Sequence, residues 1–259
     1  MNFIDTHTHI NDDALYVDRK DVISRAKEKG CLAIFNNGDS LESLSKIISI
    51  QNEFPNYCYS VLGIHPEFAI KDDDYHKASF DYVLEHIKEI KAIGEIGLDY
   101  HYEINDEIKE RQKKIFIEWI RFAKKYNLPI VVHSRDAAKD TFDIIKEEKP
   151  SVVDLHCYSS SYELYKEYMK LPISFHIGIG GVVTFKNAKV LKEVVEKGEI
   201  SSFLTETDAP YLAPTPFRGS RNESSYIPYI IKMIAELKNM NEEEVSEILL
   251  RNGKQFYGI

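Results

Sequence analysis

Residues 3–10 read Phe3-Ile4-Asp5-Thr6-His7-Thr8-His9-Ile10, a run of strand-forming residues that carries two histidines. Successive side chains of a strand alternate between its two faces, so His7 and His9 are expected on one face with Asp5, while Thr8 points away. Two imidazoles on one rigid strand form half of a metal site. A lone His-x-His pair also arises by chance, so the interpretation depends on further ligands elsewhere in the chain.

The chain has 259 residues, of which 43% are hydrophobic and 29% charged, a globular composition that supports one large core or two small ones. No linker, low-complexity tract or shift in composition divides it. We therefore expect a single domain over residues 1–259.

Several classes of protein are disfavoured. The N-terminus lacks the basic and apolar regions of a signal peptide, and no run approaches the ~18 apolar residues of a membrane span. The three cysteines, Cys31, Cys58 and Cys157, show no C-x-x-C spacing, which indicates reduced thiols and a cytoplasmic setting. The net charge of −9 argues against a protein that coats long nucleic acid, but it allows an enzyme that admits one phosphodiester at a metal site. No obligate protein partner is evident.

Short apolar runs alternate with amphipathic segments along the whole chain. The predicted strands are Phe3–His9, Leu32–Asn36, Tyr59–Ile64, Ala92–Leu98, Ile130–His133, Val152–His156, Ile173–Ile177 and Phe203–Thr207. The predicted helices are Asp18–Lys29, Leu41–Asn52, Lys77–Ile90, Asp106–Tyr126, Asp136–Glu148, Tyr162–Lys170, Asn187–Glu196, Tyr226–Asn239 and Glu242–Tyr257.

This alternation predicts an α/β fold, a (β/α)8 TIM barrel with an additional C-terminal helix. A doubly wound open sheet is the alternative. It usually has a glycine-rich phosphate turn after its first strand, and none is present here.

The active site of such a barrel lies at the C-terminal ends of the strands. Six candidate metal ligands occupy those ends: His7, His9, Glu95, His133, His156 and Asp208. Any one of these residues, taken alone, could also be a buried polar residue of the core that binds no metal. Together they exceed the three or four protein ligands of a single catalytic zinc, and they suit two metals that share a carboxylate. Glu95 is the candidate bridge, because Gly94 and Gly97 leave room for close approach.

The predicted catalytic residues are Glu95 and Asp208, the latter placed to bind a metal and to accept a proton from an activated water. Glu206 has the same strand parity as Asp208, and we expect it one layer deeper. There it would orient a ligating histidine or form an ion pair with a buried cation.

The other histidines carry weaker expectations. His76 and His86 fall in helical segments that we expect to face solvent. His176, on the seventh strand, suits a core or supporting role, and His101, in the loop after the fourth strand, is within reach of the site.

Seven motifs resemble the TatD family of metal-dependent deoxyribonucleases, within the amidohydrolase superfamily. They are Phe3-Ile4-Asp5-Thr6-His7-Thr8-His9, Gly63-Ile64-His65-Pro66, Gly94-Glu95-Ile96-Gly97-Leu98-Asp99-Tyr100, residues 128–137 (Leu128-Pro129 to Asp136-Ala137), His156-Cys157-Tyr158-Ser159, residues 180–187 (Gly180-Gly181 to Lys186-Asn187) and Glu206-Thr207-Asp208-Ala209-Pro210-Tyr211-Leu212. The His-x-His motif is common to the superfamily, whereas the motifs of the fourth, fifth and eighth strands in this order are specific. The resemblance covers essentially the whole chain.

The resemblance implies a TIM barrel, a pair of divalent metals and hydrolysis of DNA phosphodiesters, often from an end. It implies that His7, His9 and Asp208 hold one metal, that His133 and His156 hold the other, and that Glu95 bridges them. It places His65 near the substrate phosphate.

The chain departs from the family pattern at two places. Ser160 stands where the family usually has a glycine, and Ser224 and Ser225 follow Arg221-Asn222-Glu223 where it usually has a proline. We expect both places in loops over the mouth, where they bear on the shape of the substrate.

The loop over residues 214–222 is the candidate for binding DNA, because it follows the Asp208 strand and carries Arg218 and Arg221. Arginine suits bidentate contact with phosphate, and Phe217 or Tyr211 is suited to stack on a base. The alternative is a rigid loop that packs on the last helices. Arg135 is a further candidate for substrate phosphate.

The leading hypothesis is therefore a metal-dependent 3′–5′ exonuclease that uses Mg, Mn or Zn, with DNA ends or single strands as substrate. Four imidazoles favour a transition metal, whereas the resemblance implies activity supported by Mg. The second hypothesis is an ester or amide hydrolase with the same metal pair, such as a D-aminoacyl-tRNA deacylase. The third is a binding role without catalysis.

Overall fold

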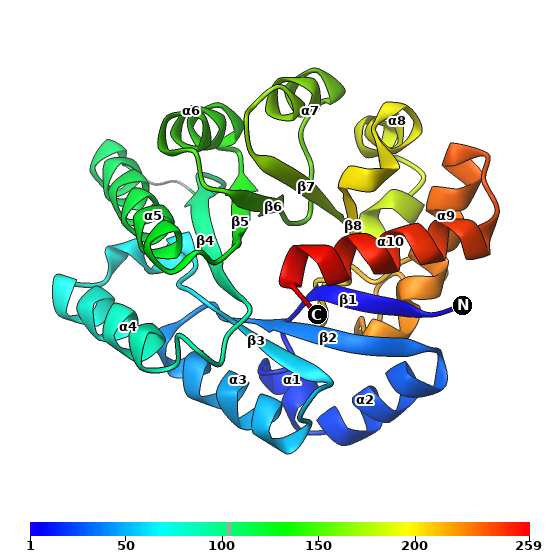
Figure 1. Ribbon diagram of the computed structural model, residues 1–259, viewed down its shortest axis with the longest axis horizontal. Coiled ribbons are helices and arrows are strands. Elements are labelled where there is room, and N and C mark those ends of the chain that lie inside the picture. Colours follow the sequence, from blue (N-terminus) through cyan, green and yellow to red (C-terminus); the bar gives the residue numbers. More distant parts are fainter. Residues whose placement is uncertain (103–104) are drawn as a thin grey trace.

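The computed structural model describes residues 1–102 and 105–259, and eight parallel strands form its centre (Figure 1). The strands are β1 (Phe3–Thr8), β2 (Cys31–Asn37), β3 (Cys58–Leu62), β4 (Ala92–Asp99), β5 (Ile130–Arg135), β6 (Val152–Leu155), β7 (Ser174–Ile179) and β8 (Phe203–Thr205). Each strand pairs with the next in sequence order. The first and last meet where Thr8 bridges to Ala209 in parallel, so the sheet curves into a nearly closed barrel.

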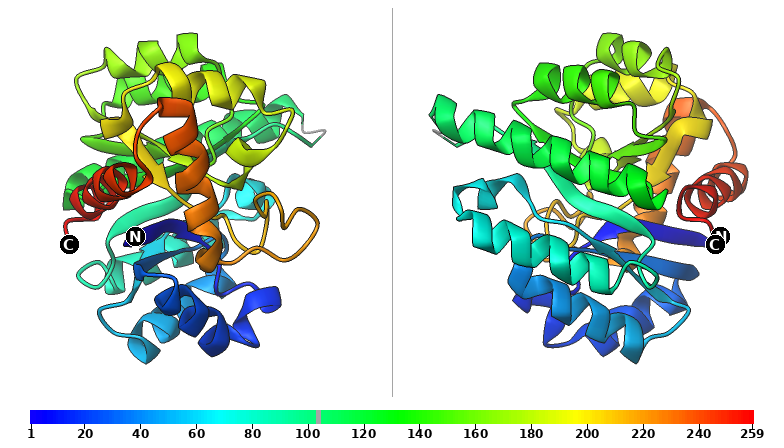
Figure 2. Two further views of the ribbon diagram at one scale, coloured as in Figure 1. Left: turned by 90° about the vertical axis from the view of Figure 1, so that its right-hand side faces the viewer. Right: turned by 60° about the vertical axis from the view of Figure 1, so that its left-hand side comes forward.

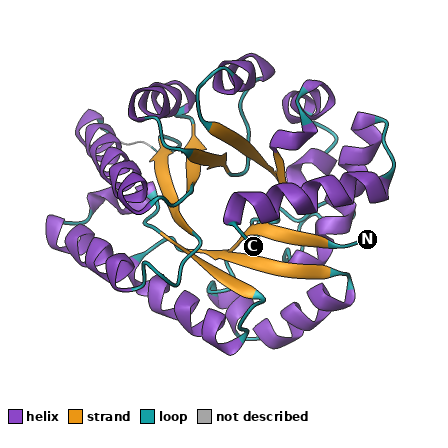
Figure 3. Cartoon of the chain, viewed as in Figure 1, coloured by secondary structure: helices purple, strands orange, loops and turns teal. Residues whose placement is uncertain are grey.

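Helices surround this sheet (Figure 3). They are α1 (Asp13–Tyr16), α2 (Arg19–Glu28), α3 (Leu41–Glu53), α4 (Asp73–Glu85), α5 (Asp106–Tyr126), α6 (Ala138–Glu148), α7 (Tyr162–Met169), α8 (Lys189–Lys197), α9 (Ile227–Lys238) and α10 (Glu242–Tyr257). The predicted (β/α)8 barrel with an additional C-terminal helix is confirmed, and the open-sheet alternative is wrong.

The helix predicted over Lys77–Ile90 is displaced by about a turn, because α4 begins at Asp73 and ends at Glu85. The side chain of Asp72 accepts a hydrogen bond from the Tyr75 amide and caps the helix. An aspartate that satisfies a free amide of the first turn is a strong helix start, so Asp72 sets this boundary ahead of the apolar pattern.

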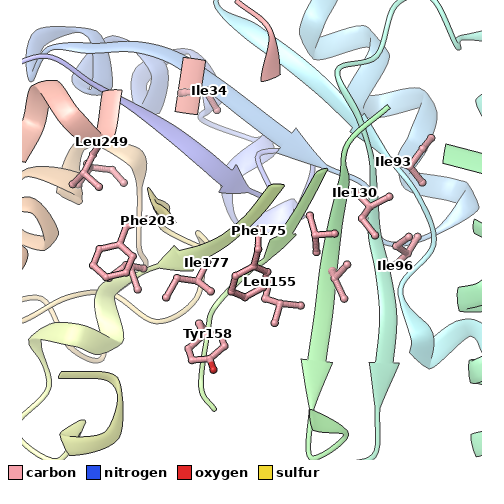
Figure 4. Close-up of a cluster of buried hydrophobic side chains, with 14 of the residues drawn as sticks. Ile34, Ile93, Ile96, Ile130, Leu155, Tyr158, Phe175, Ile177, Phe203 and Leu249 are labelled. Atoms are coloured by element: carbon pink, nitrogen blue, oxygen red, sulfur yellow. The ribbon is translucent and has the colours of Figure 1, made fainter. Parts of the chain in front are cut away.

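The apolar core has two layers. The larger one lies between the strands and the surrounding helices, and Figure 4 shows part of it, including Ile93, Ile130 and Phe203. A smaller cluster combines residues of β1 to β5 and β8 with Phe256 and Tyr257 of α10. The helix α10 therefore covers the barrel at the end where the strands begin.

The two ends of the barrel differ in character. The Tyr257 ring stacks on Phe35 with 3.5 Å between ring centroids, and its hydroxyl donates to the Thr6 carbonyl at 2.7 Å. Figure 2 shows α10 and both termini at one end of the molecule and the loop after β8 at the opposite end.

Within the described residues, no helix combines the length and apolarity needed to span a membrane.

Removal of the Tyr257 side chain tests the role of α10 in stability. Because the ring is almost fully buried, Tyr257→Ala is expected to lower the free energy of unfolding by about 3–5 kcal/mol. Tyr257→Phe keeps the ring and loses one hydrogen bond, so a loss of about 1 kcal/mol is expected. Urea denaturation followed by circular dichroism measures both. Equal losses for the two variants would contradict the role given to the ring.

Candidate metal centre

The Glu95 carboxylate lies between two pairs of histidines at the C-terminal ends of the strands. Its Oε1 is 2.6 Å from His156 Nε2 and 2.9 Å from His133 Nδ1. Its Oε2 is 3.4 Å from His7 Nε2 and 3.6 Å from His9 Nε2. One carboxylate oxygen therefore faces each pair, which is the arrangement of a bridging ligand.

Within each pair the two ring nitrogens are spaced as ligands of one ion would be. His7 Nε2 and His9 Nε2 are 3.2 Å apart, and so are His133 Nδ1 and His156 Nε2. Two tetrahedral ligands at the usual zinc–nitrogen distance lie about 3.3 Å apart. Asp208 Oδ1 completes the first pair at 3.4 Å from His9 Nε2. The six predicted ligands are thus brought together, and their spacing fits two cation positions that share Glu95.

Partners outside the centre set the orientation of two of the rings. His9 Nδ1 donates to the Asn37 carbonyl at 3.1 Å, which leaves the Nε2 lone pair directed at the centre. His133 Nε2 is 3.0 Å from Asp99 Oδ2, which leaves Nδ1 as the inward atom. Such outer partners fix the tautomer and raise the basicity of a ligating imidazole.

The role of Asp99 was not predicted, although it belongs to the fourth-strand motif. It is the last residue of β4, and its position at a strand end is the signal that could have identified it. The Gln112 side chain on α5 bonds to both the amide and the carbonyl of Asp99, at 2.9 and 3.0 Å, and holds it in place.

Burial and charge oppose each other in this cluster. Burial by itself lowers the pKa of His133, but the hydrogen bonds to Asp99 and Glu95 outweigh it and raise this pKa to about 9. Burial raises the pKa of Glu95, yet the surrounding histidines bring it well below its ordinary value. For His7, burial and the His156 charge lower the pKa to about 4. A bound cation must displace the proton on His133, so cation binding weakens as the pH falls.

Glycine lets β4 approach β5 closely enough to bring Glu95 to His133. Gly97 has a φ of +144°, and a Cβ at this position would lie 2.0 Å from the His133 carbonyl oxygen. No other residue tolerates both the conformation and the contact. The expectation of close approach beside Glu95 is therefore met.

Asp5 does not share the face of His7 and His9, and this expectation was wrong. Its carboxylate accepts hydrogen bonds from Thr207 Oγ1 and Ser224 Oγ, both at 2.6 Å. The pairing of β1 with β2 is irregular between Asp5 and Thr8. Such an irregularity breaks the alternation of faces on which the expectation depended.

Glu206 lies deeper than Asp208, as its strand parity predicts. Its Oε1 is 4.0 Å from His156 Nδ1 and accepts the Cys157 amide. Burial and the nearby Asp154 raise the pKa of Glu206 well above its usual range. Within the described chain Glu206 pairs with no lysine or arginine, and at 4.0 Å it is too far from His156 Nδ1 for a hydrogen bond, so its role toward that ring stays a prediction.

A cavity of about 610 Å³ opens over the centre, and we call it the metal pocket. It is lined by His9, Asp12, Asp39, His65, Glu67, Glu95, Asp99, Tyr102, His133, Ser134, Arg135, His156, Cys157, Ser159, Asp208, Tyr211 and Leu212. Five of the six candidate ligands line this pocket, whereas His7 is fully buried beneath it, and His65 and Arg135 lie beside them.

The family model described as "TatD related DNase" matches residues 4–258. The chain belongs to the TatD family. It is 40% identical over 98% of both chains to "Uncharacterized metal-dependent hydrolase YabD" of Bacillus subtilis. It is 35% identical to a metal-dependent hydrolase of Methanocaldococcus jannaschii, MJ1582, over 99% of this chain and 97% of that one.

Solved structures agree with this assignment. The TatD homologue YJJV from Escherichia coli superposes with a TM-score of 0.90 at 27% identity, over 99% of this chain and 98% of that one. A TatD family hydrolase from Entamoeba histolytica has a TM-score of 0.85 at 22% identity, over 99% and 98%, and shows the shared fold. This TatD family protein is a metal-dependent hydrolase.

His65 enters the metal pocket in a defined tautomer. Its Nδ1 accepts the Glu67 amide at 3.2 Å, so the neutral ring carries its proton on Nε2. Burial and the His133 charge lower the pKa of His65 to about 4, which keeps the ring neutral. Its ring packs edge-on against His133 with 4.3 Å between centroids.

The structure does not bring Arg218 and Arg221 to the metal pocket of this TatD family protein. Arg221 makes two hydrogen bonds to the Asp18 carboxylate, at 2.8 and 2.7 Å. Arg218 lies over the Phe185 ring at 4.0 Å. Phe217 stacks on Tyr226, so this part of the loop packs on the start of α9, whereas Tyr211 lines the metal pocket.

Ser224 and Ser225 are buried rather than exposed over the mouth, which corrects that expectation. Ser224 bonds to Asp5, as described, and Ser225 donates to Glu223. The two serines that depart from the family pattern thus form hydrogen bonds within the fold and do not shape the mouth. Ser160 lies in the loop between β6 and α7.

The remaining histidines lie outside the metal pocket. His76 is buried on α4, so the expectation that it faces solvent was wrong, and His86 is half-buried with Nδ1 3.0 Å from the Tyr82 carbonyl. His101 contacts Asp136 at 2.8 Å. His176 is buried beside Phe256, in agreement with a core role.

The contact between Asp99 and His133 predicts how metal affinity responds to mutation. Asp99→Asn weakens the acceptor that fixes the His133 tautomer, so metal affinity is expected to fall roughly 10- to 100-fold. Titration against a fluorescent chelator measures this loss. Asp81→Asn, on the exposed face of α4, is the matched control. An affinity unchanged in Asp99→Asn would show that the contact does not act on the centre.

The ion pair between Arg25 and Glu223 predicts a pH-dependent contribution to stability. Burial raises the pKa of Glu223, but Arg25, at 2.6 Å, outweighs it and lowers this pKa below the usual 4.5. The pair therefore stabilises the fold above pH 4.5, and this contribution is lost as the pH falls through the depressed pKa.

Glu223→Gln is accordingly expected to cost about 1 kcal/mol at pH 7, a modest value because the Arg25 side chain is 42% exposed. Urea denaturation at several pH values measures the difference from the unmodified protein. The difference should shrink as the pH is lowered below 4.5, and a constant difference would contradict the assignment.

Proposed function

We propose that this protein hydrolyses DNA phosphodiester bonds from the 3′ end, as a metal-dependent 3′–5′ exonuclease. The observation that carries the proposal is the position of Glu95, whose two oxygens face two separate histidine pairs. A pair of metals sharing one carboxylate is typical of enzymes that displace groups at phosphorus. The DNase description of the matching family model supports DNA as the substrate.

In this proposal His7, His9 and Asp208 hold one divalent ion, His133 and His156 hold the other, and Glu95 contacts both. Mg, Mn and Zn are the candidates, with imidazole favouring the transition metals. Bound there, such ions would lower the pKa of a coordinated water and polarise a phosphoryl oxygen.

The protein supplies the proton transfers and the orientation of the substrate. Burial raises the pKa of Asp208, but His9 and the other histidines bring it below its ordinary value, so the carboxylate is ionised and able to accept a proton. Neutral His65 donates from Nε2 to a phosphate oxygen. Arg135 is exposed at the end of β5 and offers its guanidinium to the same phosphate.

The pocket's volume of about 610 Å³ suits the end of a strand rather than a duplex.

The wall of the metal pocket also gives a reason to test a second candidate function, hydrolysis of an aminoacyl ester such as that of a D-aminoacyl-tRNA. Asp12, Asp39 and Glu67 line the wall, and carboxylates favour a substrate with a free amine.

Digestion of 5′-labelled single-stranded and duplex DNA with Mg, Mn or Zn tests the proposal. The wild-type protein is expected to shorten the DNA stepwise from its 3′ end. Asp208→Ala removes a ligand and the proton acceptor, so a loss of at least about 100-fold is expected. Lys77→Ala, at an exposed ion pair on α4, serves as the control.

Intact DNA under every metal, together with hydrolysis of D-aminoacyl esters, would replace the first candidate with the second. Full cleavage by Asp208→Ala would contradict the role of Asp208 or reveal a contaminating nuclease.

A further inference from the structure

A second cavity, of about 430 Å³, adjoins the metal pocket, and we call it the side cavity. Cys157 and Ser159, in the loop after β6, line both spaces. The far wall comes from the segment after β7 and from the start of α8, including Val182, Asn187 and Val190. A group in the side cavity would therefore lie next to a bond held at the metal centre.

The lining of the side cavity differs from that of the metal pocket. Within the described residues it contains no aspartate or glutamate. Tyr158 is buried, and its hydroxyl is committed to the Ser161 carbonyl at 2.9 Å, which leaves the ring as an apolar surface. The exposed Asn187 amide and Ser159 hydroxyl add polar groups at the wall. The cavity thus suits a flat apolar group with a hydrogen-bonding edge.

Positive side chains lie along the same side of the mouth. Lys186 and Lys189, which flank the turn into α8, are exposed. Arg218 is held there by its position over Phe185, at 4.0 Å from the ring centroid. The loop that carries Arg218 is tied to this segment because the Thr215 amide donates to Thr184 Oγ1 at 2.8 Å.

The opposite side of the mouth is acidic. Asp39 follows β2 and Glu67 follows β3, and in an eight-stranded barrel these strands lie across from β6 and β7. A polyanionic strand is attracted to the lysine and arginine side and repelled by the carboxylate side. The charge distribution therefore selects one direction of approach.

We propose that the side cavity binds the base of the nucleotide next to the cleaved phosphodiester, and that Lys186, Lys189 and Arg218 contact the phosphates of the strand that leads to it. This inference rests on the proposed nuclease function and adds the substrate contacts of the same site. A base has apolar faces and a polar edge, which match the apolar walls and the Asn187 amide. The volume lies in the range of small-ligand pockets, ~300–1,000 Å³.

The test compares two 5′-labelled oligonucleotides, one with an ordinary 3′-terminal nucleotide and one whose terminal nucleotide lacks its base. The wild-type protein is expected to cleave the ordinary end roughly tenfold faster in kcat/KM, as loss of one base contact implies. Val190→Trp fills the side cavity from a residue that is 50% exposed. It is expected to slow the ordinary end to the rate of the end without a base, and to leave the latter within about twofold.

Two controls separate this effect from a general defect, and a second variant provides an independent test. Leu84→Trp places the same ring at a 43% exposed position on α4 and is expected to match the wild type. Metal affinity, measured by titration against a fluorescent chelator, should be unchanged in Val190→Trp, because Val190 lines the side cavity and not the metal pocket. Asn187→Ala, expected to reduce the preference for the ordinary end, is the second variant if Val190→Trp does not fold.

The outcomes distinguish the two proposals. Equal cleavage of both ends by the wild-type protein, or a preference that survives in both Val190→Trp and Asn187→Ala, would overturn the base site and leave the nuclease function in place. Absence of DNA cleavage under every metal would contradict the nuclease function and the base site together.

Discussion

The structure depends on one buried carboxylate. Glu95 is almost inaccessible to solvent, and its two oxygens lie within 2.6–3.6 Å of four imidazole nitrogens. A carboxylate in such a place is costly unless charge and hydrogen bonds compensate for the lost hydration. Three strands supply those histidines: His7 lies in β1 and His9 follows it, while His133 and His156 stand at the ends of β5 and β6. The barrel topology is what delivers them to one point.

Apolar packing covers the opposite end of the barrel, where α10 places Tyr257 against Phe35. At the end that holds Glu95, the loop after β8 contributes hydrogen bonds and an ion pair. Asn222 donates to the carbonyls of Thr207 and Tyr211, on either side of Asp208, and the neighbouring Glu223 pairs with α2. The loop that was predicted to bind DNA thus holds the candidate ligand Asp208 in position.

The barrel and the convergence of six candidate ligands could be predicted from the sequence because both follow from local patterns. Alternating apolar runs and helices specify parallel strands, and parallel strands place their last polar residues together. What could not be predicted depends on contacts between distant segments or on local irregularity. From the sequence alone, Arg221 is predicted to be free to bind a substrate phosphate, but in the fold it pairs with Asp18 on a distant segment. Asp5 reads as a neighbour of His7 until an irregularity in β1 turns it away, and the burial of His76 depends on how α4 packs.

The central claim is that Glu95 holds two cations between its histidine pairs. Anomalous diffraction from crystals grown with Mn²⁺ tests it directly. The account predicts two anomalous peaks roughly 3.5–4 Å apart, one near His7 and His9 and one near His133 and His156, with Glu95 in contact with both. A single peak, or two peaks of which one does not touch Glu95, would contradict it.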